Sequence, residues 1–181
     1  QRQMCIRDRP ETIGSIAYLS KFREKLKKEI LCGINLSCVG DERSFSYINS
    51  PYKNTLADKV LESATKGLKN LKVYSFLERG SDERQYCTPN IDLPFCTFCR
   101  SKFGEYPEYH TDADNLDLVT NKGLNDSFKV LKNIVDSFEM GLYPKLKTLC
   151  EPNLGKRNLY PKLNNYTCLL YTSPSPRDGL L

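Results

Sequence analysis

The only histidine of the chain lies in a run of acidic, aromatic and polar residues. The segment EYPEYHTDADN places His110 directly after Tyr109. Four carboxylates surround this pair: Glu105, Glu108, Asp112 and Asp114. An imidazole beside carboxylates is a ligand set that Zn²⁺ and similar ions prefer, and a tyrosine hydroxyl can polarise a carbonyl group. The segment therefore indicates a candidate metal site, with an ordinary polar surface loop as the alternative.

A second candidate is the CxxC motif formed by Cys96 and Cys99. Such a pair binds zinc or acts as a redox couple. A structural zinc ion needs four ligands, however, and the sequence has no second CxxC or histidine pair at the usual spacing. The surrounding LPFCTFC is typical of a buried strand in which cysteine serves as a small hydrophobic residue. We favour the buried strand and keep redox chemistry as the alternative.

A third candidate is the polar triplet DER, which occurs twice. It occupies residues 41–43, after INLSCVG, and residues 82–84, after KVYSFLERGS, and both preceding segments are expected to be strands. In open α/β sheets, ligands bind beyond the carboxyl ends of the strands, so the two acidic groups are expected to lie close together. The alternative is a pair of solvated loops in which acidic and basic side chains pair with each other.

The elements that would position these residues alternate between helix and strand. The spacing of apolar residues predicts helices over residues 12–29, 55–69 and 124–138. Runs of β-favouring residues predict strands over residues 29–40, 72–78 and 93–99. Residues 41–54 between them are polar and rich in turn formers. This order of elements predicts a layered α/β domain.

Composition indicates a soluble globular domain. The 181 residues are 39% hydrophobic and 27% charged, which is enough apolar material for a core. No apolar run approaches the roughly 20 residues that a membrane helix needs, and no segment resembles a secretory signal. We therefore expect no membrane association and a cytoplasmic location.

Both ends of the chain read as foreign to it. Residues 1–9 and 168–181 resemble translated sequencing-adapter segments, and neither continues a periodic pattern. Without these ends, which hold four arginines and two aspartates, the formal charge falls from +5 to +3. That balance is too small to argue for nucleic-acid binding by itself.

Four stretches carry a family resemblance: PETIGSIAYLS, GDERSFSYINSP, SDERQYCTPNIDLPFCTFCRSKFGEYPEYHTDADNLD and EPNLGKRNLYP. In this order they resemble bacterial aminopeptidase-like domain proteins, which carry a winged-helix appendage and are associated with polysaccharide biosynthesis. That family is similar in fold to the zinc aminopeptidases. The resemblance implies a three-layer α/β fold with a mixed central sheet, incomplete in this fragment. Residues 10–145 would be the C-terminal half of the aminopeptidase-like domain, and residues 146–167 a connection toward a missing winged helix.

The resemblance also implies the residues that react. Tyr109 and His110 match a YH motif of the zinc enzymes, in which the tyrosine steadies the oxyanion and the histidine binds metal. Glu11, just before GSIAY, matches one member of their glutamate pair. The resemblance implies that Glu11 is the general base or a metal ligand.

Two further matches concern residues around the metal. Ser37 stands where the NLD motif of the zinc enzymes has its metal-binding aspartate, and Asp41, four residues on, is expected to take that place. Ser81 and Asp82 resemble an SD pair, which we expect to support the ligands through hydrogen bonds without binding the metal.

The implied activity of the intact protein is metal-dependent hydrolysis of an amide, in a peptide or an amino-sugar derivative, with one or two zinc ions. Glu11 would be the general base, and Tyr109 would face the developing negative charge. The fragment alone is expected to be inactive, because the upstream ligands of the zinc enzymes fall outside it. The alternative is a non-catalytic aminopeptidase-like scaffold or binding module, in which only the missing winged helix would contact nucleic acid.

Overall fold

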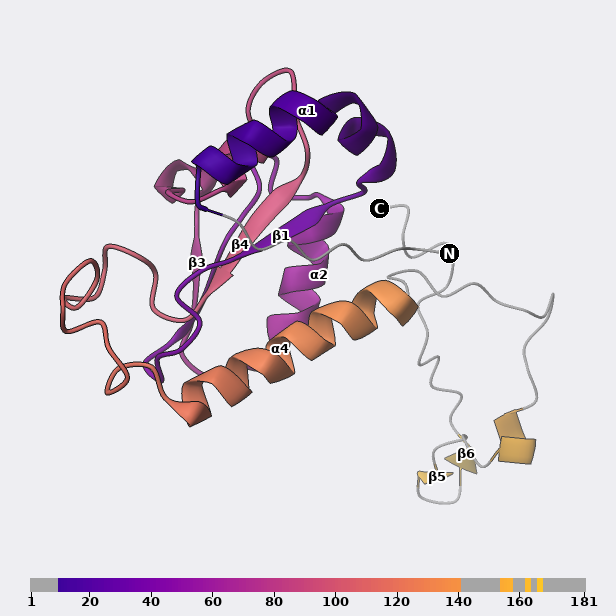
Figure 1. The fold of residues 1–181 in the computed structure, drawn as a ribbon. Helices are drawn as coiled ribbons and strands as arrows, with labels where there is room; N and C mark the ends of the chain where they lie inside the picture. The colour runs from indigo at the N-terminus through magenta and orange to yellow at the C-terminus, as the bar shows by residue number, and fades with distance from the viewer. Residues whose placement is uncertain (1–9, 141–153, 158–161, 164–165, 168–181) are drawn as a thin grey trace. The chain divides into compact units, whose positions relative to one another are not determined.

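The computed structural model describes residues 10–140, 154–157, 162–163 and 166–167 (Figure 1). The chain divides into two compact units, residues 1–140 and 141–181. The two ends expected to be foreign, and most of the connection expected over residues 146–167, lie outside the described residues. The described part of the second unit comprises a 3-10 helix η2 (Leu154–Arg157) and an antiparallel pair, β5 (Lys162–Leu163) and β6 (Tyr166–Thr167).

Three helices of the first unit form where the apolar spacing predicts them: α1 (Ile13–Glu29), α2 (Leu56–Thr65) and α4 (Asn121–Met140). The short α3 (Glu83–Tyr86) and the 3-10 helix η1 (Phe76–Glu78) were not predicted, and η1 replaces the end of the strand expected over residues 72–78. A capping box fixes the start of α2, because Thr55 and Asp58 each bond the backbone N–H of the other. The three helices expected from the sequence are confirmed. No described helix is long and apolar enough to cross a membrane.

The central sheet is mixed. Its strands are β1 (Gly33–Leu36), β2 (Phe45–Ile48), β3 (Leu71–Tyr74) and β4 (Phe95–Cys99), in the order β1-β4-β2-β3. β1 and β4 are parallel, β2 and β3 are parallel, and β2 and β4 are antiparallel. β1 and β3 therefore run in opposite directions.

The expectation of a turn-rich passage over residues 41–54 is wrong at β2. Although this strand contains serine and is flanked by polar residues, it lies inside the sheet between β3 and β4. Ser46 has no exposed surface, and Tyr47 and Ile48 are also buried. A strand of four residues contains too few alternations for its period to be visible in the sequence.

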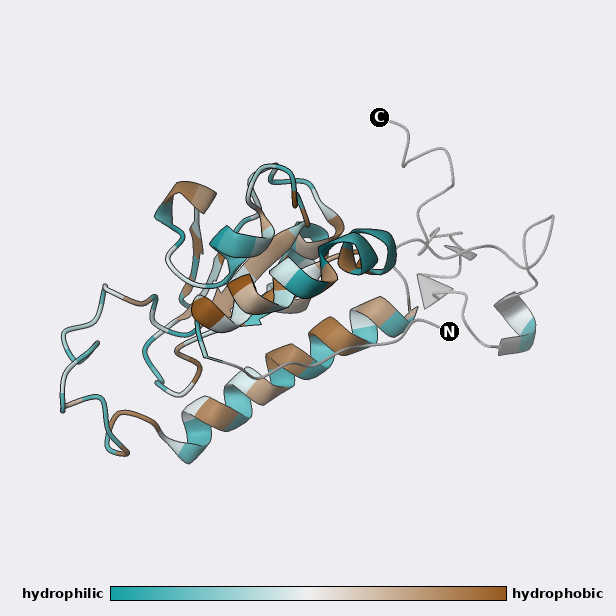
Figure 2. Cartoon of the chain, turned by 45° about the horizontal axis from the view of Figure 1, so that its top comes forward, coloured by the Kyte–Doolittle hydropathy of each residue, from teal (hydrophilic) through white to brown (hydrophobic). Residues whose placement is uncertain are grey.

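Helices cover both faces of the sheet, as Figures 1 and 2 show for α1 and α4. On β4, the Cys96 thiol donates to Asp58 of α2 at 3.2 Å, and the next side chain, Thr97, donates to Glu83 of α3 at 2.8 Å. Because successive side chains of a strand point to opposite faces, α2 and α3 lie on opposite sides. α4 packs on α2, and α1 packs on α3. The result is a three-layer α/β arrangement.

Candidate functional site

The candidate site forms where the chain leaves β1 and β4. These strands are parallel, so both end at the same edge of the sheet. Their pairing continues past the strands, since Ser37 N–H donates to the Phe98 carbonyl at 3.2 Å and Arg100 N–H donates to the Cys38 carbonyl at 2.9 Å. The loop after β1 and the long loop after β4 are therefore held side by side.

Asp41 ties these two loops together. One of its oxygens accepts the backbone N–H of Ser101 at 2.8 Å, and the other accepts the Ser101 hydroxyl at 2.8 Å and the Arg43 N–H at 2.9 Å. The residue is buried, with 6% of its surface exposed. A carboxylate has about four lone-pair sites, and three are used here. Asp41 therefore acts in this structure as a brace between loops, and its carboxylate is poorly available to a metal ion.

The loop after β4 is fixed by a second contact with the loop after β1. The Arg43 guanidinium donates two hydrogen bonds to Glu108, at 2.8 and 2.6 Å. This bidentate contact is the chief cause that lowers the pKa of Glu108 to about 2. In addition, the Tyr106 hydroxyl lies 3.4 Å from the Cys38 sulfur. The segment just before Tyr109 is thus anchored to the sheet edge.

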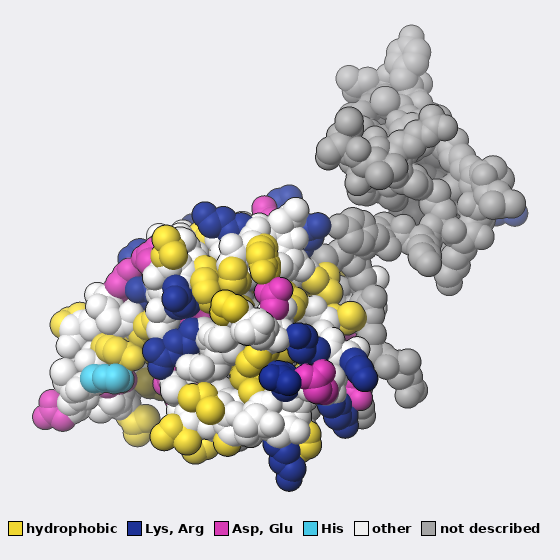
Figure 3. All heavy atoms as spheres, turned by 90° about the horizontal axis from the view of Figure 1, so that it is seen from above, with side chains coloured by type: hydrophobic (Ala, Val, Ile, Leu, Met, Phe, Trp, Pro, Cys, Tyr) yellow, Lys and Arg dark blue, Asp and Glu magenta, His cyan; other side chains and the backbone are white. Residues whose placement is uncertain are grey.

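Tyr109 and His110 stack on each other, with ring centroids 4.0 Å apart. The Tyr109 phenol is partly buried, and burial raises its pKa, with smaller increases from the charges of Cys38 and Glu11. His110 is exposed, and Figure 3 shows its imidazole at the surface. Its φ of 60° lies in the left-handed region, which is uncommon for residues other than glycine and concentrates at functional sites.

Glu11 lies two residues before α1 begins at Ile13, and its charge makes the smallest of the three contributions that raise the pKa of the Tyr109 phenol. The backbone there is fixed from a distant segment. Asp82 accepts the N–H of Thr12 at 2.6 Å, and Arg84 donates to the Thr12 hydroxyl at 2.9 Å. Asp82 thus supports the Glu11 segment through the backbone of the neighbouring residue.

Ser81 is buried and belongs to the same turn as Asp82. Its backbone N–H donates to Glu83 at 3.1 Å, and its carbonyl accepts the N–H of Arg84 at 3.3 Å. Ser81 therefore helps to shape the turn that carries Asp82.

Glu83 is the residue that the sequence analysis missed. Its side chain has no exposed surface and accepts four hydrogen bonds: from the N–H groups of Gly80 and Ser81, and from the side chains of Asn35 and Thr97. The available signal was a polar residue inside each of two expected strands, because Asn35 and Thr97 are paired in register. Two such residues on neighbouring strands indicate a buried polar partner.

The expectation that the two DER triplets lie close together at the carboxyl ends of their strands is wrong in its premise. Because β1 and β3 run in opposite directions, their carboxyl ends lie at opposite edges of the sheet. After β3 the chain continues through η1 to the turn at residues 80–82. Asp82 in this turn then contacts Thr12. No described hydrogen bond joins one triplet to the other.

The CxxC motif is part of the core. Cys96 and Cys99 have no exposed surface. Burial raises the pKa of both thiols, that of Cys99 to about 12. The prediction of a buried strand is confirmed. A redox couple needs an accessible thiol with a low pKa, and these two thiols have the opposite properties.

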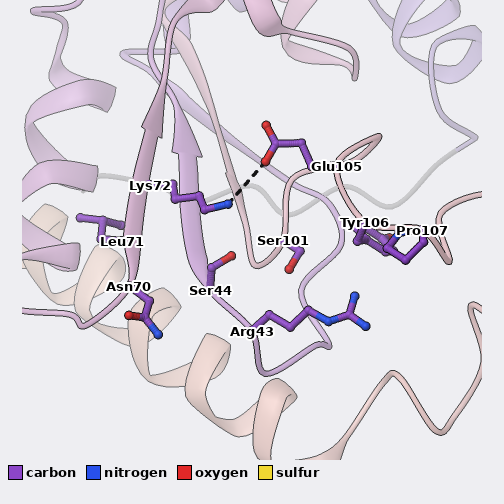
Figure 4. A pocket seen from close by; sticks show the side chains of 9 residues that line it. All are labelled: Arg43, Ser44, Asn70, Leu71, Lys72, Ser101, Glu105, Tyr106 and Pro107. Carbon is purple, nitrogen blue, oxygen red and sulfur yellow. Dashed lines mark ion pairs between the residues drawn. The ribbon is translucent and has the colours of Figure 1, made fainter.

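A cavity of about 450 Å³ lies beside the loop after β4 (Figure 4). Its lining includes Arg43, Lys72 and Glu105, and the last two form an ion pair at 3.6 Å. Tyr106 lines this cavity and also a second one of about 200 Å³ that borders Cys38. The larger cavity is in the size range of small-molecule sites. Tyr106 also meets Tyr109 edge-on, with centroids 5.6 Å apart.

The metal ligands expected from the sequence do not assemble within the described residues. No three side chains of His, Cys, Asp or Glu in this part of the chain are grouped so that they could hold a metal ion. His110 is exposed, whereas Asp41 is engaged with Ser101 and Arg43.

Comparisons with known sequences find a matching family model and a curated relative. A family model described as a domain of unknown function (DUF4910) matches residues 5–141. A Clostridium acetobutylicum protein is 39% identical over 153 residues, which cover 83% of this chain and 35% of the relative. Its name, given provisionally, is polysaccharide biosynthesis protein with aminopeptidase-like domain. The chain thus spans about a third of the length of this curated relative.

Solved structures give the same result. A crystal structure provisionally described as a peptidase from Clostridium acetobutylicum is 37% identical, with a TM-score of 0.72, over 82% of this chain and 35% of that one. An aminopeptidase from Aneurinibacillus sp. strain AM-1 is 21% identical with a TM-score of 0.58, over 69% and 30% of the two chains. BSAP, a zinc aminopeptidase from Bacillus subtilis, is 18% identical with a TM-score of 0.58, over 70% and 32%. The last two show likeness of fold alone. The chain therefore belongs to the family described as a domain of unknown function (DUF4910), and its fold is that of the aminopeptidases.

Proposed function

We propose that the intact protein hydrolyses an amide bond, in a peptide or in an amino-sugar derivative used in polysaccharide biosynthesis. The observation that carries this proposal is that Glu11 and Tyr109, far apart in the sequence, lie near enough for the charge of Glu11 to contribute to the raised pKa of the Tyr109 phenol. The aminopeptidase-like name of the relative and the fold of the solved structures support the same class of reaction. The chain spans only part of its relatives, so the activity is proposed for the intact protein.

Glu11 and Tyr109 have complementary roles in this proposal. Glu11 is exposed, so its carboxylate can take a proton from the water that attacks the amide carbonyl and can later pass that proton to the leaving amine. General bases of this kind contribute about 10²- to 10⁴-fold in rate. The Tyr109 hydroxyl is protonated at neutral pH, as in an ordinary tyrosine, and burial raises its pKa further, so it can donate a hydrogen bond to the oxygen that becomes negative.

We further propose that the intact protein uses zinc, one ion or two, with His110 as a ligand. Bound zinc supplies a Lewis acid and an activated water. Catalytic zinc sites usually have three protein ligands, and the described residues do not fit such a site by themselves, because no group of three is present among them. The other ligands would come from residues outside the described ones.

A second candidate function is a non-catalytic aminopeptidase-like scaffold that binds a partner. Two observations favour it. The carboxylate of Asp41, which the sequence suggests as a metal ligand, accepts hydrogen bonds from Ser101 and Arg43 instead. The family resemblance implies that Ser37 stands where the zinc enzymes have a metal-binding aspartate, and a hydroxyl is a poor zinc ligand.

Metal analysis of the intact protein separates the two functions. The hydrolase predicts stoichiometric zinc that is lost in His110→Ala, together with hydrolysis in a library of aminoacyl amides and N-acyl amino sugars. Leu116→Ala, at a position that is 87% exposed, serves as a control in the same loop. A metal-free protein with no activity toward any member of the library would establish the scaffold.

A further inference from the structure

Glu83 is a buried carboxyl group with no part in the chemistry proposed above. We infer that it is a positioning residue, which fixes the turn at residues 80–82 so that this turn holds both the Glu11 segment and the Tyr109 loop in place. The inference rests on the proposed hydrolase function. The structural link from Glu83 to Thr12 can be tested independently of that function.

The two oxygens of Glu83 connect two different parts of the fold. One oxygen accepts the hydroxyl of Thr97 at 2.8 Å and the amide of Asn35 at 3.2 Å, on the adjacent strands β4 and β1. The other accepts the backbone N–H groups of Gly80 at 2.9 Å and Ser81 at 3.1 Å. The turn is thereby tied directly to the sheet.

On its outer side the turn holds the start of α1. Asp82 accepts the Thr12 N–H at 2.6 Å, and Arg84 donates to the Thr12 hydroxyl at 2.9 Å. Thr12 has a φ of 63°, a conformation that β-branched residues adopt only when their surroundings impose it. The contacts from Asp82 and Arg84 supply that constraint. Glu11 is the residue directly before Thr12, so its position depends on the turn.

The same turn also meets the loop that carries Tyr109. Gly80 lies against the ring of Phe103, so closely that a Cβ at this position would be 2.6 Å from a ring carbon. The Phe103 ring in turn neighbours that of Tyr109, with centroids 6.4 Å apart. The turn thus contacts the surroundings of both residues proposed to react, and Glu83 is what anchors it.

A carboxyl group is a costly way to fill this space. Among the described residues no ion pair involves Glu83, so its burial is compensated by four hydrogen bonds from neutral donors. An apolar side chain of similar size would fill the same volume and leave those donors without a partner. The hydrogen bonds, and the geometry they impose on the turn, are therefore what this side chain adds beyond packing.

Two substitutions at Glu83 separate geometry from packing. Glu83→Leu keeps the volume and removes every acceptor. Glu83→Gln keeps an oxygen for Gly80 and Ser81, and its amide can donate to the Thr97 hydroxyl, which also accepts, so that only the hydrogen bond from Asn35 is lost. Glu62→Ala on α2 is an exposed control. The Glu83→Leu protein can fail to fold. Asp82→Ala, at a partly buried residue, is a milder substitution that removes only the acceptor for the Thr12 N–H.

Two measurements follow on the intact protein. Amide hydrogen exchange at Thr12 should accelerate by about tenfold or more in Asp82→Ala and Glu83→Leu, and remain near the unsubstituted rate in Glu83→Gln. In hydrolysis, Asp82→Ala should lower kcat by about 10- to 100-fold with little change in KM, because the base is misplaced while substrate binding is retained. In a Glu11→Gln background the same change should cost less than about twofold, since both substitutions then act on one group.

The outcomes distinguish the inference from the function. If the unsubstituted protein hydrolyses amides but Asp82→Ala leaves kcat unchanged, or lowers it equally in the Glu11→Gln background, the positioning role is overturned and the hydrolase stands. If no hydrolysis occurs, the proposed function fails, and Thr12 exchange alone decides the structural link. Unchanged Thr12 exchange in Asp82→Ala would overturn that link.

Discussion

The Arg43 guanidinium donates two hydrogen bonds to the Glu108 carboxylate, at 2.8 and 2.6 Å, and so joins the loop after β1 to the loop after β4. Arg43 is 47% exposed at its side chain and Glu108 is 22% exposed. Planar paired contacts of this kind fix orientation as well as distance. Glu108 immediately precedes Tyr109, so this contact sets where the Tyr109–His110 pair begins.

Removal of this contact should loosen the loop without unfolding the domain. In Glu108→Gln the paired geometry is lost, and we expect backbone amide exchange at Tyr109 and His110 to accelerate by less than about tenfold, because the contact is partly solvated. High salt should reproduce part of the effect in the unsubstituted protein. Asp112→Asn in the same loop is the control. Equal exchange in Glu108→Gln and the unsubstituted protein would show that the contact does not order the loop.

Asp58 should make stability depend on pH. Burial raises the pKa of Asp58, but hydrogen bonds from Ser50 and Thr55 outweigh this and lower it below 3.8. A carboxyl group whose pKa is lower in the folded state stabilises the fold above its unfolded value, and this contribution is lost as the pH falls through the folded value. Chemical denaturation from pH 6 to pH 2 should therefore show stability decreasing below about pH 4.

The substitution Asp58→Ala should reduce this pH dependence and leave the part that comes from other carboxyl groups with a lowered pKa, such as Glu108. It should also lower the free energy of unfolding at pH 7 by roughly 1 to 3 kcal/mol, since buried donors lose their acceptor. Asp117→Ala, at an exposed position, should change neither quantity. If stability falls equally at low pH with and without Asp58, the pH dependence arises from other groups.

Helix α4 can pack closely only because position 123 is glycine. A Cβ at Gly123 would overlap the carbonyl oxygen of Gly40, at the start of the loop that carries Asp41. Gly123→Ala should therefore destabilise the protein by about 1 to 3 kcal/mol, measured as a lower denaturation midpoint. Asn125→Ala on the exposed face of α4 should have little effect. A Gly123→Ala protein as stable as the unsubstituted one would mean that α4 shifts freely.

Cys96 and Cys99 should react slowly with iodoacetamide at pH 7. Both thiols are fully buried, and burial raises the pKa of each, so little thiolate is present and little reagent reaches it. Mass spectrometry of the native protein should find them unmodified at times when the same protein in denaturant is fully labelled. Rapid labelling of the native protein would restore the redox interpretation.

The sequence predicts the helices well, because apolar residues at helical spacing recur over several turns, as in α4. The functional role expected of Tyr109 and His110 stays a prediction, and the structure shows only that their rings stack. The sequence fails to predict β2, whose four residues are too few to show a period. Short strands of this kind are identified by their neighbours in the sheet, which lie far away in the sequence.

The candidate site is also only partly predictable from the sequence. Asp41 was expected to bind metal, but its partners include the backbone N–H groups of Ser101 and Arg43, and backbone donors carry no signature in a sequence. In the sequence Glu83 is one of several charged loop residues, and only the pairing of β1 with β4 reveals its partners. The residue types were visible in the sequence. Their long-range hydrogen bonds were not.

The central claim is that Glu11 removes a proton during amide hydrolysis by the intact protein. The most direct test is steady-state hydrolysis of the best amide substrate by the unsubstituted protein, Glu11→Gln and the exposed control Glu24→Gln. The account predicts that Glu11→Gln lowers kcat by about 10²- to 10⁴-fold with little change in KM, while Glu24→Gln retains full activity. A Glu11→Gln protein with the kcat of the unsubstituted enzyme would contradict it.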